Sequence, residues 1–287
     1  SDWYYLDSTD GKMITGWIND GNKRYYADKD GKMQTGWLVD GKNTYFLAPS
    51  GVMTTGWVND NNTWYYMDNN GRMQTGWIDT GNQRYYMDNT GKMQTGWTDI
   101  GNSRYFLTKS GAMYKGWLND SGAWYYMDNN GVMKTGWIND KNTWYYTDNT
   151  GKMQTGWIKD GNDWYYIDKS GSISTGWVND GGTWYYLDGS GKMQTGWIDL
   201  NNQRYFLSPS GAMKTGWINV DKNWYYMNSS GSMARGMINV NNVSYYLDES
   251  GKMLSNTTVN VNGTDYRIDA SGAMSQIVPE ITATPET

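Results

Sequence analysis

The sequence contains no cysteine and no histidine. Without cysteine it has neither a disulfide framework nor a thiolate metal site, and without histidine it lacks the commonest general base and metal ligand. No apolar run approaches the roughly 18–20 residues of a membrane span. A formal net charge of −5 offers no basic face to nucleic acid. We therefore expect no cofactor, no metal site, no nucleic-acid partner and no membrane span.

Leu, Ile and Val are also sparse, and a few residue types take their place. The 287 residues include 18 Trp, 25 Tyr, 18 Met and 36 Gly. A single compact core of this length normally draws on branched aliphatic side chains. The composition therefore points to internal repeats.

A period of 20 residues runs through most of the chain. Glycine recurs at every twentieth position from Gly11 to Gly251, and a second glycine recurs from Gly16 to Gly236. Tryptophan follows that second glycine in eleven repeats, from Trp17 to Trp217. Such strict spacing is typical of a solenoid, in which each unit packs mainly on its neighbours. We predict an all-β repeat solenoid of stacked β-hairpins.

Within a repeat, the sequence predicts one hairpin. The stretch WYYMD (64–68) has high strand propensity, NNG supplies a turn, and RMQTGW (72–77) returns as the second strand. The stretch NDNN (59–62) would then link one hairpin to the next. Alternation along the strand places Trp64 and Tyr66 on one face and Tyr65 and Met67 on the other.

The two ends depart from the repeat. We predict a degenerate first unit at 1–16 and tandem repeats up to residue 255. A degenerate capping repeat follows at 256–274, where the interval from Gly251 to Gly272 is 21 residues, and atypical terminal units are expected as caps. The last segment, 275–287, carries Pro and Thr and is expected to be weakly structured.

The tryptophans occupy only two places in the repeat, seven residues apart, as in Trp57 and Trp64. If hairpins stack, two indoles and a phenol of the next unit would bound a slot that is open to solvent. Such a slot suits a quaternary ammonium, which cannot donate hydrogen bonds but is attracted to π-faces. Each slot would bind weakly, and a row of them would bind a multivalent polymer tightly. The alternative is that these rings form the core between repeats.

Other recurring residues are expected to serve the fold. These are the glycines, the first tyrosine of each pair, the methionines and the aspartates beside the turn, such as Asp68, Asp88, Asp128 and Asp148. An aspartate at that place is expected to stabilise an Asx-type turn. A catalytic carboxylate pair would occur once, whereas these recur every 20 residues, so we assign no catalytic residue and expect no enzyme.

The phrase TGWINDKNTWYYTDNTGKM (135–153) resembles the choline-binding repeat, also called the cell-wall-binding repeat, of pneumococcal surface proteins and lytic enzymes. The resemblance covers nearly the whole chain. It implies a left-handed superhelix of hairpins with choline or phosphocholine bound between consecutive hairpins. It also implies that each cage combines the two tryptophans of one repeat with a tyrosine of the next.

Carried over residue by residue, the resemblance implies six choline-binding cages. The last but one named below has phenylalanine in place of tyrosine. The cages are Trp57, Trp64 and Tyr86; Trp117, Trp124 and Tyr146; Trp137, Trp144 and Tyr166; Trp157, Trp164 and Tyr186; Trp177, Trp184 and Phe206; and Trp217, Trp224 and Tyr246.

The remaining repeats lack the second tryptophan. It is replaced by arginine at 24, 84, 104 and 204, by Thr44 and by Ser244. An arginine there removes one wall, and its guanidinium could stack on the glycine-linked tryptophan and fill the slot. We therefore predict choline-silent slots at Trp17, Trp77, Trp97 and Trp197. Neutral drift in a structural repeat is the alternative.

The resemblance implies a non-enzymatic, extracellular protein attached non-covalently to a Gram-positive cell wall. Its partner would be choline-bearing teichoic or lipoteichoic acid, and it could restrain wall hydrolases by competing for the same choline. Two alternatives stay open. One is the wall-targeting module of a larger lytic enzyme, and the other is a repeat module that stacks glucan on its aromatic rings.

Overall fold

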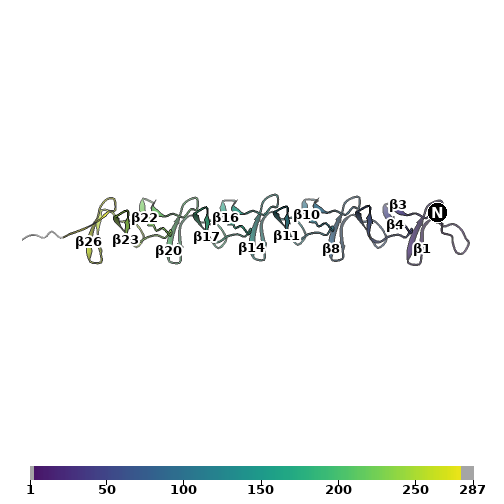
Figure 1. Ribbon diagram of the computed structural model, residues 1–287, viewed down its shortest axis with the longest axis horizontal. Helices are drawn as coiled ribbons and strands as arrows, with labels where there is room; N and C mark the ends of the chain where they lie inside the picture. Colours follow the sequence, from purple (N-terminus) through teal and green to yellow (C-terminus); the bar gives the residue numbers. More distant parts are fainter. Residues whose placement is uncertain (1–2, 279–287) are drawn as a thin grey trace, which may run out of the picture. The chain divides into compact units, whose positions relative to one another are not determined.

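The computed structural model describes residues 3–278, which form strands, turns and loops and contain no helix. They fall into two compact units. Unit 1 comprises Ser1–Ile138 and Thr147–Met153, and unit 2 comprises Asn139–Tyr146 and Gln154–Thr287. The boundary runs through the residues of β13 (Gly136–Asp140) and β14 (Thr143–Thr147). Each unit is a run of similar β-hairpins (Figure 1).

In unit 1 each hairpin joins two antiparallel five-residue strands that follow each other in the chain. The pairs are β1 (Gly16–Asp20) with β2 (Lys23–Ala27), β3 (Gly36–Asp40) with β4 (Asn43–Leu47), β5 (Gly56–Asp60) with β6 (Thr63–Met67), β7 (Gly76–Thr80) with β8 (Gln83–Met87), β9 (Gly96–Ile100) with β10 (Ser103–Leu107), and β11 (Gly116–Asp120) with β12 (Ala123–Met127).

Unit 2 repeats the same hairpin and ends in a three-stranded sheet. The pairs are β15 (Gly156–Asp160) with β16 (Asp163–Ile167), β17 (Gly176–Asp180) with β18 (Thr183–Leu187), β19 (Gly196–Leu200) with β20 (Gln203–Leu207), β21 (Gly216–Val220) with β22 (Asn223–Met227), and β23 (Gly236–Val240) with β24 (Val243–Leu247). The final sheet is β25 (Thr257–Val261), β26 (Thr264–Ile268) and β27 (Met274–Gln276).

The predicted position of the hairpin turn is wrong. The turn lies at Asn61–Asn62, within the stretch assigned above to a linker, and it joins β5 to β6. Both asparagines have positive φ (49° and 63°), as a two-residue type I′ turn requires. The predicted turn at NNG is followed only by a single bridge between Met67 and Met73. The strand over 64–68 is essentially as predicted, but its partner precedes it in the chain.

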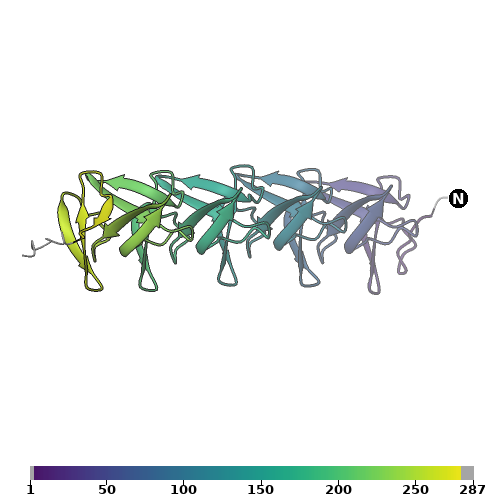
Figure 2. The same cartoon turned by 60° about the vertical axis from the view of Figure 1, so that its left-hand side comes forward.

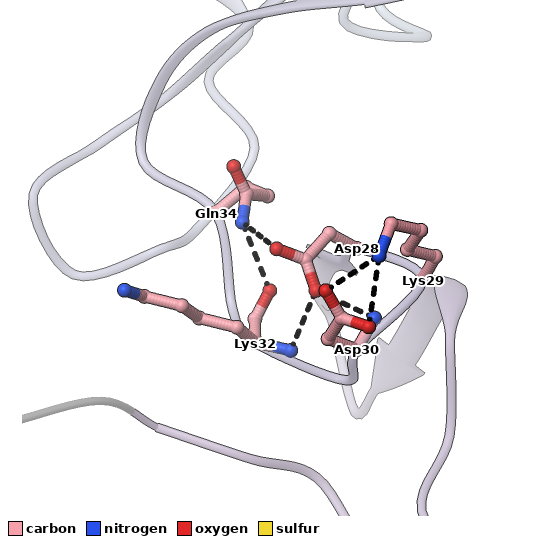
Figure 3. Close-up of polar contacts among 5 residues, drawn as sticks. All are labelled: Asp28, Lys29, Asp30, Lys32 and Gln34. Carbon is pink, nitrogen blue, oxygen red and sulfur yellow. Dashed lines mark hydrogen bonds and ion pairs between the residues drawn. The ribbon is translucent and has the colours of Figure 1, made fainter.

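The loop after each hairpin is held by an aspartate, as predicted. In Figure 3 the Oδ1 atom of Asp28 accepts hydrogen bonds from the backbone amides of Asp30 (2.9 Å) and Lys32 (3.0 Å), and its Oδ2 accepts one from the Gln34 amide (2.8 Å). Asp68, Asp88, Asp128 and Asp148 repeat this Asx pattern. These carboxylates have a structural role in their turns.

Consecutive repeats are joined by backbone and side-chain packing. The Met93 amide donates to the Trp64 carbonyl (2.9 Å), and the Met73 amide donates to the Thr44 carbonyl (2.7 Å) in the same way. The last residue of each second strand is almost fully buried and forms the core. These residues are Ala27, Leu47, Met67, Met87, Leu107, Met127, Thr147, Ile167, Leu187, Leu207, Met227, Leu247 and Ile268.

Within each unit, every third hairpin points to the same side, as β1 and β8 do in unit 1 and β20 and β26 in unit 2 (Figures 1 and 2). Together with the repeated packing, this confirms the predicted all-β solenoid of stacked hairpins. At its end, β27 pairs with β26. Ser275 and Gln276 therefore belong to a strand and not to a weakly structured tail, whereas residues 279–287 of the predicted tail lie outside the described residues.

The Asx turns predict sensitivity to acid. The Ser190 hydroxyl lowers the pKa of the Asp188 carboxyl, burial opposes this, and the backbone amides of Ser190 and Lys192 lower it further. A lowered folded-state pKa stabilises the fold above the unfolded value of about 4 and loses that contribution as pH falls through the folded value. Asp188→Asn should therefore reduce the loss of thermal stability between about pH 5 and pH 3.

The measurement is the melting temperature of the wild type and of Asp188→Asn across that range. Asparagine is compatible with this turn, since the chain itself carries Asn228 at the equivalent place with the same backbone hydrogen bonds. Equal acid sensitivity of the two proteins would show that this carboxylate does not contribute.

Candidate functional site

The two tryptophans of a repeat meet at nearly right angles in four hairpins. Trp57 on β5 and Trp64 on β6 have ring centroids 6.2 Å apart and ring planes at 85°. The other pairs are alike, at 6.4–6.5 Å and 81–86°. They are Trp157 with Trp164, Trp177 with Trp184, and Trp217 with Trp224.

The strand register explains this meeting. Trp57 lies directly opposite Tyr66, and the two rings are in contact at 5.2 Å. Residues opposite each other in an antiparallel pair share a face, and so do alternate residues of one strand. Trp57, Trp64 and Tyr66 therefore share one face of the hairpin, and Tyr65 lies on the other.

A third ring comes from the following hairpin. Tyr85, on β8, packs edge-on against Trp57 with centroids 4.7 Å apart. The same contact recurs at 4.7–5.0 Å in three further repeats. These are Trp157 with Tyr185, Trp177 with Tyr205, and Trp217 with Tyr245. The first tyrosine of each pair, expected above to serve only the fold, is thus the one that meets the preceding tryptophan.

The residues predicted as the third wall lie elsewhere. Tyr86 packs against Trp77 of its own hairpin (5.1 Å), because neighbouring residues of a strand point to opposite faces. Tyr166, Tyr186 and Phe206 likewise pack against Trp157, Trp177 and Trp197 of their own hairpins. Tyr246 lies opposite Met237 in its own hairpin. The alternation noted in the sequence contained this signal, since it separates Tyr65 from the face of Trp64.

The remaining predicted site residues are described by their exposure. Trp117, Trp137 and Tyr146 are half-buried, whereas Trp124 and Trp144 are exposed.

Two of the clusters line open cavities. Trp57, Trp64, Tyr85 and Met93 line one of about 330 Å³, together with Lys109 and Ser110. Trp177, Trp184, Tyr205 and Met213 line another of about 350 Å³, together with Ser229 and Ser230. In both cavities the methionine comes 36 residues after the first tryptophan, a constant spacing by which it could be found from the sequence.

These clusters offer aromatic faces to solvent. Trp64, Trp184 and Trp224 are 42–45% exposed, although tryptophan is usually largely buried. Aromatic faces attract cations, most strongly where the cation is poorly hydrated. The arrangement can therefore hold a small organic cation between two indoles, a phenol and a thioether, without needing a hydrogen bond from it.

In four repeats an arginine takes the place of the second tryptophan and covers the first, as predicted. The distance from the guanidinium carbon to the indole centroid is 4.2–5.1 Å. The pairs are Arg24 over Trp17, Arg84 over Trp77, Arg104 over Trp97, and Arg204 over Trp197. The guanidinium thus lies against the indole face that the second tryptophan approaches in the other repeats.

Three of these arginines also face an aspartate across the hairpin, which the sequence reasoning missed. Arg84 lies opposite Asp79, with Nε and Oδ1 3.4 Å apart. The equivalent distances are 3.6 Å for Arg104 and Asp99, and 3.3 Å for Arg204 and Asp199. Where the second tryptophan is present, the opposite residue is never aspartate. It is Asn59, Asn119, Asn139, Lys159, Asn179 or Asn219.

Within residues 3–278, no group of three or more acidic side chains has the arrangement of a metal site. The same residues form no helix that could cross a membrane.

Two family models together match most of the chain. The choline-binding repeat model matches residues 14–55, 94–135, 134–173 and 214–258. The cell wall binding repeat model matches residues 55–73, 75–93, 175–193 and 195–213. No curated protein sequence matches the chain significantly.

Solved structures of pneumococcal proteins are similar over most of the chain. CbpJ from Streptococcus pneumoniae TIGR4 is 34% identical, with 90% of this chain and 99% of that chain covered and a TM-score of 0.50. Choline binding protein F from Streptococcus pneumoniae is 31% identical, with 91% and 98% covered and a TM-score of 0.56.

The modular autolysin LytC from Streptococcus pneumoniae is also similar, at 26% identity and a TM-score of 0.55. The match covers 77% of this chain and only 52% of the autolysin. The repeated tryptophan pairs, the stacked hairpins and the matches to both family models agree: this chain belongs to the choline-binding repeat family.

Proposed function

We propose that the protein binds choline in aromatic cages between consecutive hairpins and so attaches to the bacterial cell wall. The observation that carries the proposal is the recurring cluster of two perpendicular indoles and the first tyrosine of the next hairpin. The trimethylammonium group of choline has no N–H to donate, so contact with aromatic faces is its main source of affinity.

The cages that we assign from ring contacts differ from the predicted ones in their third member. They are Trp57, Trp64 and Tyr85; Trp157, Trp164 and Tyr185; Trp177, Trp184 and Tyr205; and Trp217, Trp224 and Tyr245. We extend the assignment by sequence to the tryptophans of two more repeats, Trp117 and Trp124, and Trp137 and Trp144.

Several weak cages suit a polymer better than a free ligand. Each aromatic face contributes roughly 0.5–2 kcal/mol, which corresponds to a binding constant near the millimolar range for one cage. A polymer that carries many choline groups would engage several cages at once and gain by effective concentration. The partner that fits is choline-bearing teichoic or lipoteichoic acid, and the location is the outer face of a Gram-positive wall.

The same occupancy would let the protein act on wall metabolism without being an enzyme. Choline groups covered by this chain are not available to hydrolases that dock on them, so lysis would slow. The net charge of −5 opposes loose adsorption to wall phosphates, and recognition would then depend on the choline.

Retention on an immobilised-choline matrix tests the proposal. The protein should bind in high salt and elute with free choline, but not with sodium chloride at the same ionic strength. An anionic protein held only by charge would elute equally with both salts. Retention on an α-glucan matrix without retention on choline would favour the glucan reading of the repeat.

A second candidate role follows from the likeness to part of an autolysin. The match to 52% of LytC fits a module that carries a hydrolase to the wall. The reading frame of the gene distinguishes the two roles, because a hydrolase domain encoded in the same frame would make this chain its targeting module.

The arginine-covered slots are proposed not to bind choline. Because the guanidinium of Arg84 already lies on the indole of Trp77, a second cation would meet both a covered ring and a like charge. Arg84→Trp should remove this cation and complete a cage with Trp77 and Tyr105, whose rings are already in contact at 4.9 Å. Calorimetric titration with choline should then show one more site per chain.

Arg84→Leu is the matched control, since it removes the charge without supplying an indole. It should leave the number of sites unchanged or add only a weaker one. An unchanged stoichiometry in Arg84→Trp would argue that the missing ring is not what keeps this slot silent.

A further inference from the structure

The hairpin of β3 and β4 carries neither a second tryptophan nor an arginine. Thr44 stands at that place, opposite Val39. The backbone is unchanged there, because the Thr44 carbonyl accepts a hydrogen bond from the Met73 amide (2.7 Å), as the Arg24 carbonyl does from Met53 (2.7 Å). The short side chain leaves the first tryptophan, Trp37, 38% exposed.

The rest of this slot is complete. Trp37 contacts Tyr65 of the next hairpin, with centroids 4.6 Å apart and ring planes at 69°. Its indole Nε1 donates a hydrogen bond to the Asp60 carboxylate (2.9 Å). A carboxylate beside the ring adds a fixed negative charge where a cation would stack.

The same three residues occur twice more in unit 1, and each time they hold a guanidinium. Trp17 contacts Tyr45 at 4.6 Å and donates to Asp40 at 2.9 Å, with Arg24 over its ring at 4.2 Å.

Trp97 contacts Tyr125 at 4.8 Å and donates to Asp120 at 2.9 Å, with Arg104 over its ring at 5.0 Å. The Trp37 slot therefore has the parts that receive an arginine elsewhere in this unit, but its own chain supplies none.

We propose that the slot formed by Trp37, Thr44, Asp60 and Tyr65 binds an alkylguanidinium group in trans, the arginine side chain of a partner protein. A guanidinium is planar, stacks on an indole and donates N–H groups that a carboxylate can accept. A quaternary ammonium uses neither its shape nor its charge as well here, because the second indole is missing. The indole–carboxylate bond also occurs beside a complete pair, at Trp157, so the absent second ring is what distinguishes this slot.

The test follows the indole N–H resonances of the ¹⁵N-labelled full chain, in which Trp37→Phe identifies the signal of Trp37. Methylguanidinium is titrated against choline and methylammonium at constant ionic strength. We expect the Trp37 signal to respond at concentrations roughly threefold or more lower for methylguanidinium than for choline. N-acetylarginine amide should act like methylguanidinium, and free arginine should act more weakly if a protein side chain is the natural ligand.

Two variants of Thr44 give the matched comparison. Thr44→Arg should supply the guanidinium in cis, so that the Trp37 signal is already shifted and no longer responds. Thr44→Val keeps the volume without the charge and should respond like the wild type. Should Thr44→Arg disturb the other indole signals, Asp60→Asn serves in its place and should weaken the response to methylguanidinium.

The proposal is overturned if the Trp37 signal responds to choline at equal or lower concentrations, or if it does not respond to methylguanidinium. It is also overturned if Thr44→Arg titrates like the wild type. The signals of Trp57, Trp177 and the other cage residues report on choline in the same spectra. A failure of the guanidinium slot is therefore separate from a failure of choline binding.

Discussion

Replacing Trp64, Trp164, Trp184 and Trp224 together by alanine should abolish tight retention on immobilised choline. Each of these indoles is one wall of a cage and is 39–45% exposed, so its removal should spare the fold. A cage that loses one wall loses roughly 0.5–2 kcal/mol, and a multivalent contact loses far more because the effects combine across cages.

We expect calorimetry to show one site fewer for each tryptophan replaced. The concentration of free choline that elutes the protein should fall at least about tenfold.

The matched control changes the same place in the arginine-covered repeats. Alanine at Arg24, Arg84, Arg104 and Arg204 is the same number of substitutions at equivalent positions of the hairpin. This variant should stay on the matrix as firmly as the wild type. Equal losses in the two variants would mean that retention depends on the general integrity of the repeats and not on the paired indoles.

Gly71→Ala should give the second large effect, on stability. Gly71 has φ +78°, a left-handed conformation that costs an alanine roughly 1–2 kcal/mol. Its Cβ would also overlap the side chain of Met53 from the preceding repeat, lying 2.8 Å from Cε. Overpacking of this kind typically adds about 1–3 kcal/mol. We expect the variant to lose roughly 2–4 kcal/mol of unfolding free energy in unit 1.

Gly76→Ala separates the two causes. This glycine has nearly the same φ, +76°, but an added Cβ would meet nothing within 4 Å. Its cost should be the backbone term alone, roughly 1–2 kcal/mol. Denaturant unfolding, with hydrogen exchange of the amides in 56–87, measures both variants. If they were equally destabilised, the contact between methionine and glycine would not be what holds these repeats together.

The period and the composition were sufficient to predict the solenoid, but they did not locate its turns. NDNN and NNG both read as turn sequences. What decides between them is the positive φ at both Asn61 and Asn62, which matches the twist of two paired strands. At the other candidate turn, Asp68 accepts the amides of Asn70 and Arg72 instead and shapes a loop that leads to the next hairpin.

The tryptophan pairs were predictable for a similar reason and the third ring was not. Trp57 and Trp64 belong to one hairpin, so spacing and alternation suffice to bring them to one face. The choice between Tyr85 and Tyr86 depends on which face of the next hairpin is stacked on Trp57. Periodicity is the same for both tyrosines. The packing distance of 4.7 Å between Trp57 and Tyr85 settles it.

The first tyrosine has a consequence for how such a chain can change over generations. Every repeat from Tyr25 to Tyr245 supplies it, whatever stands in the repeat before. A gain or loss of twenty residues in frame would therefore join two compatible faces, with a phenol waiting for whichever indoles arrive. Valency becomes a matter of copy number, and one codon, for Trp or for Arg, sets whether each new copy counts.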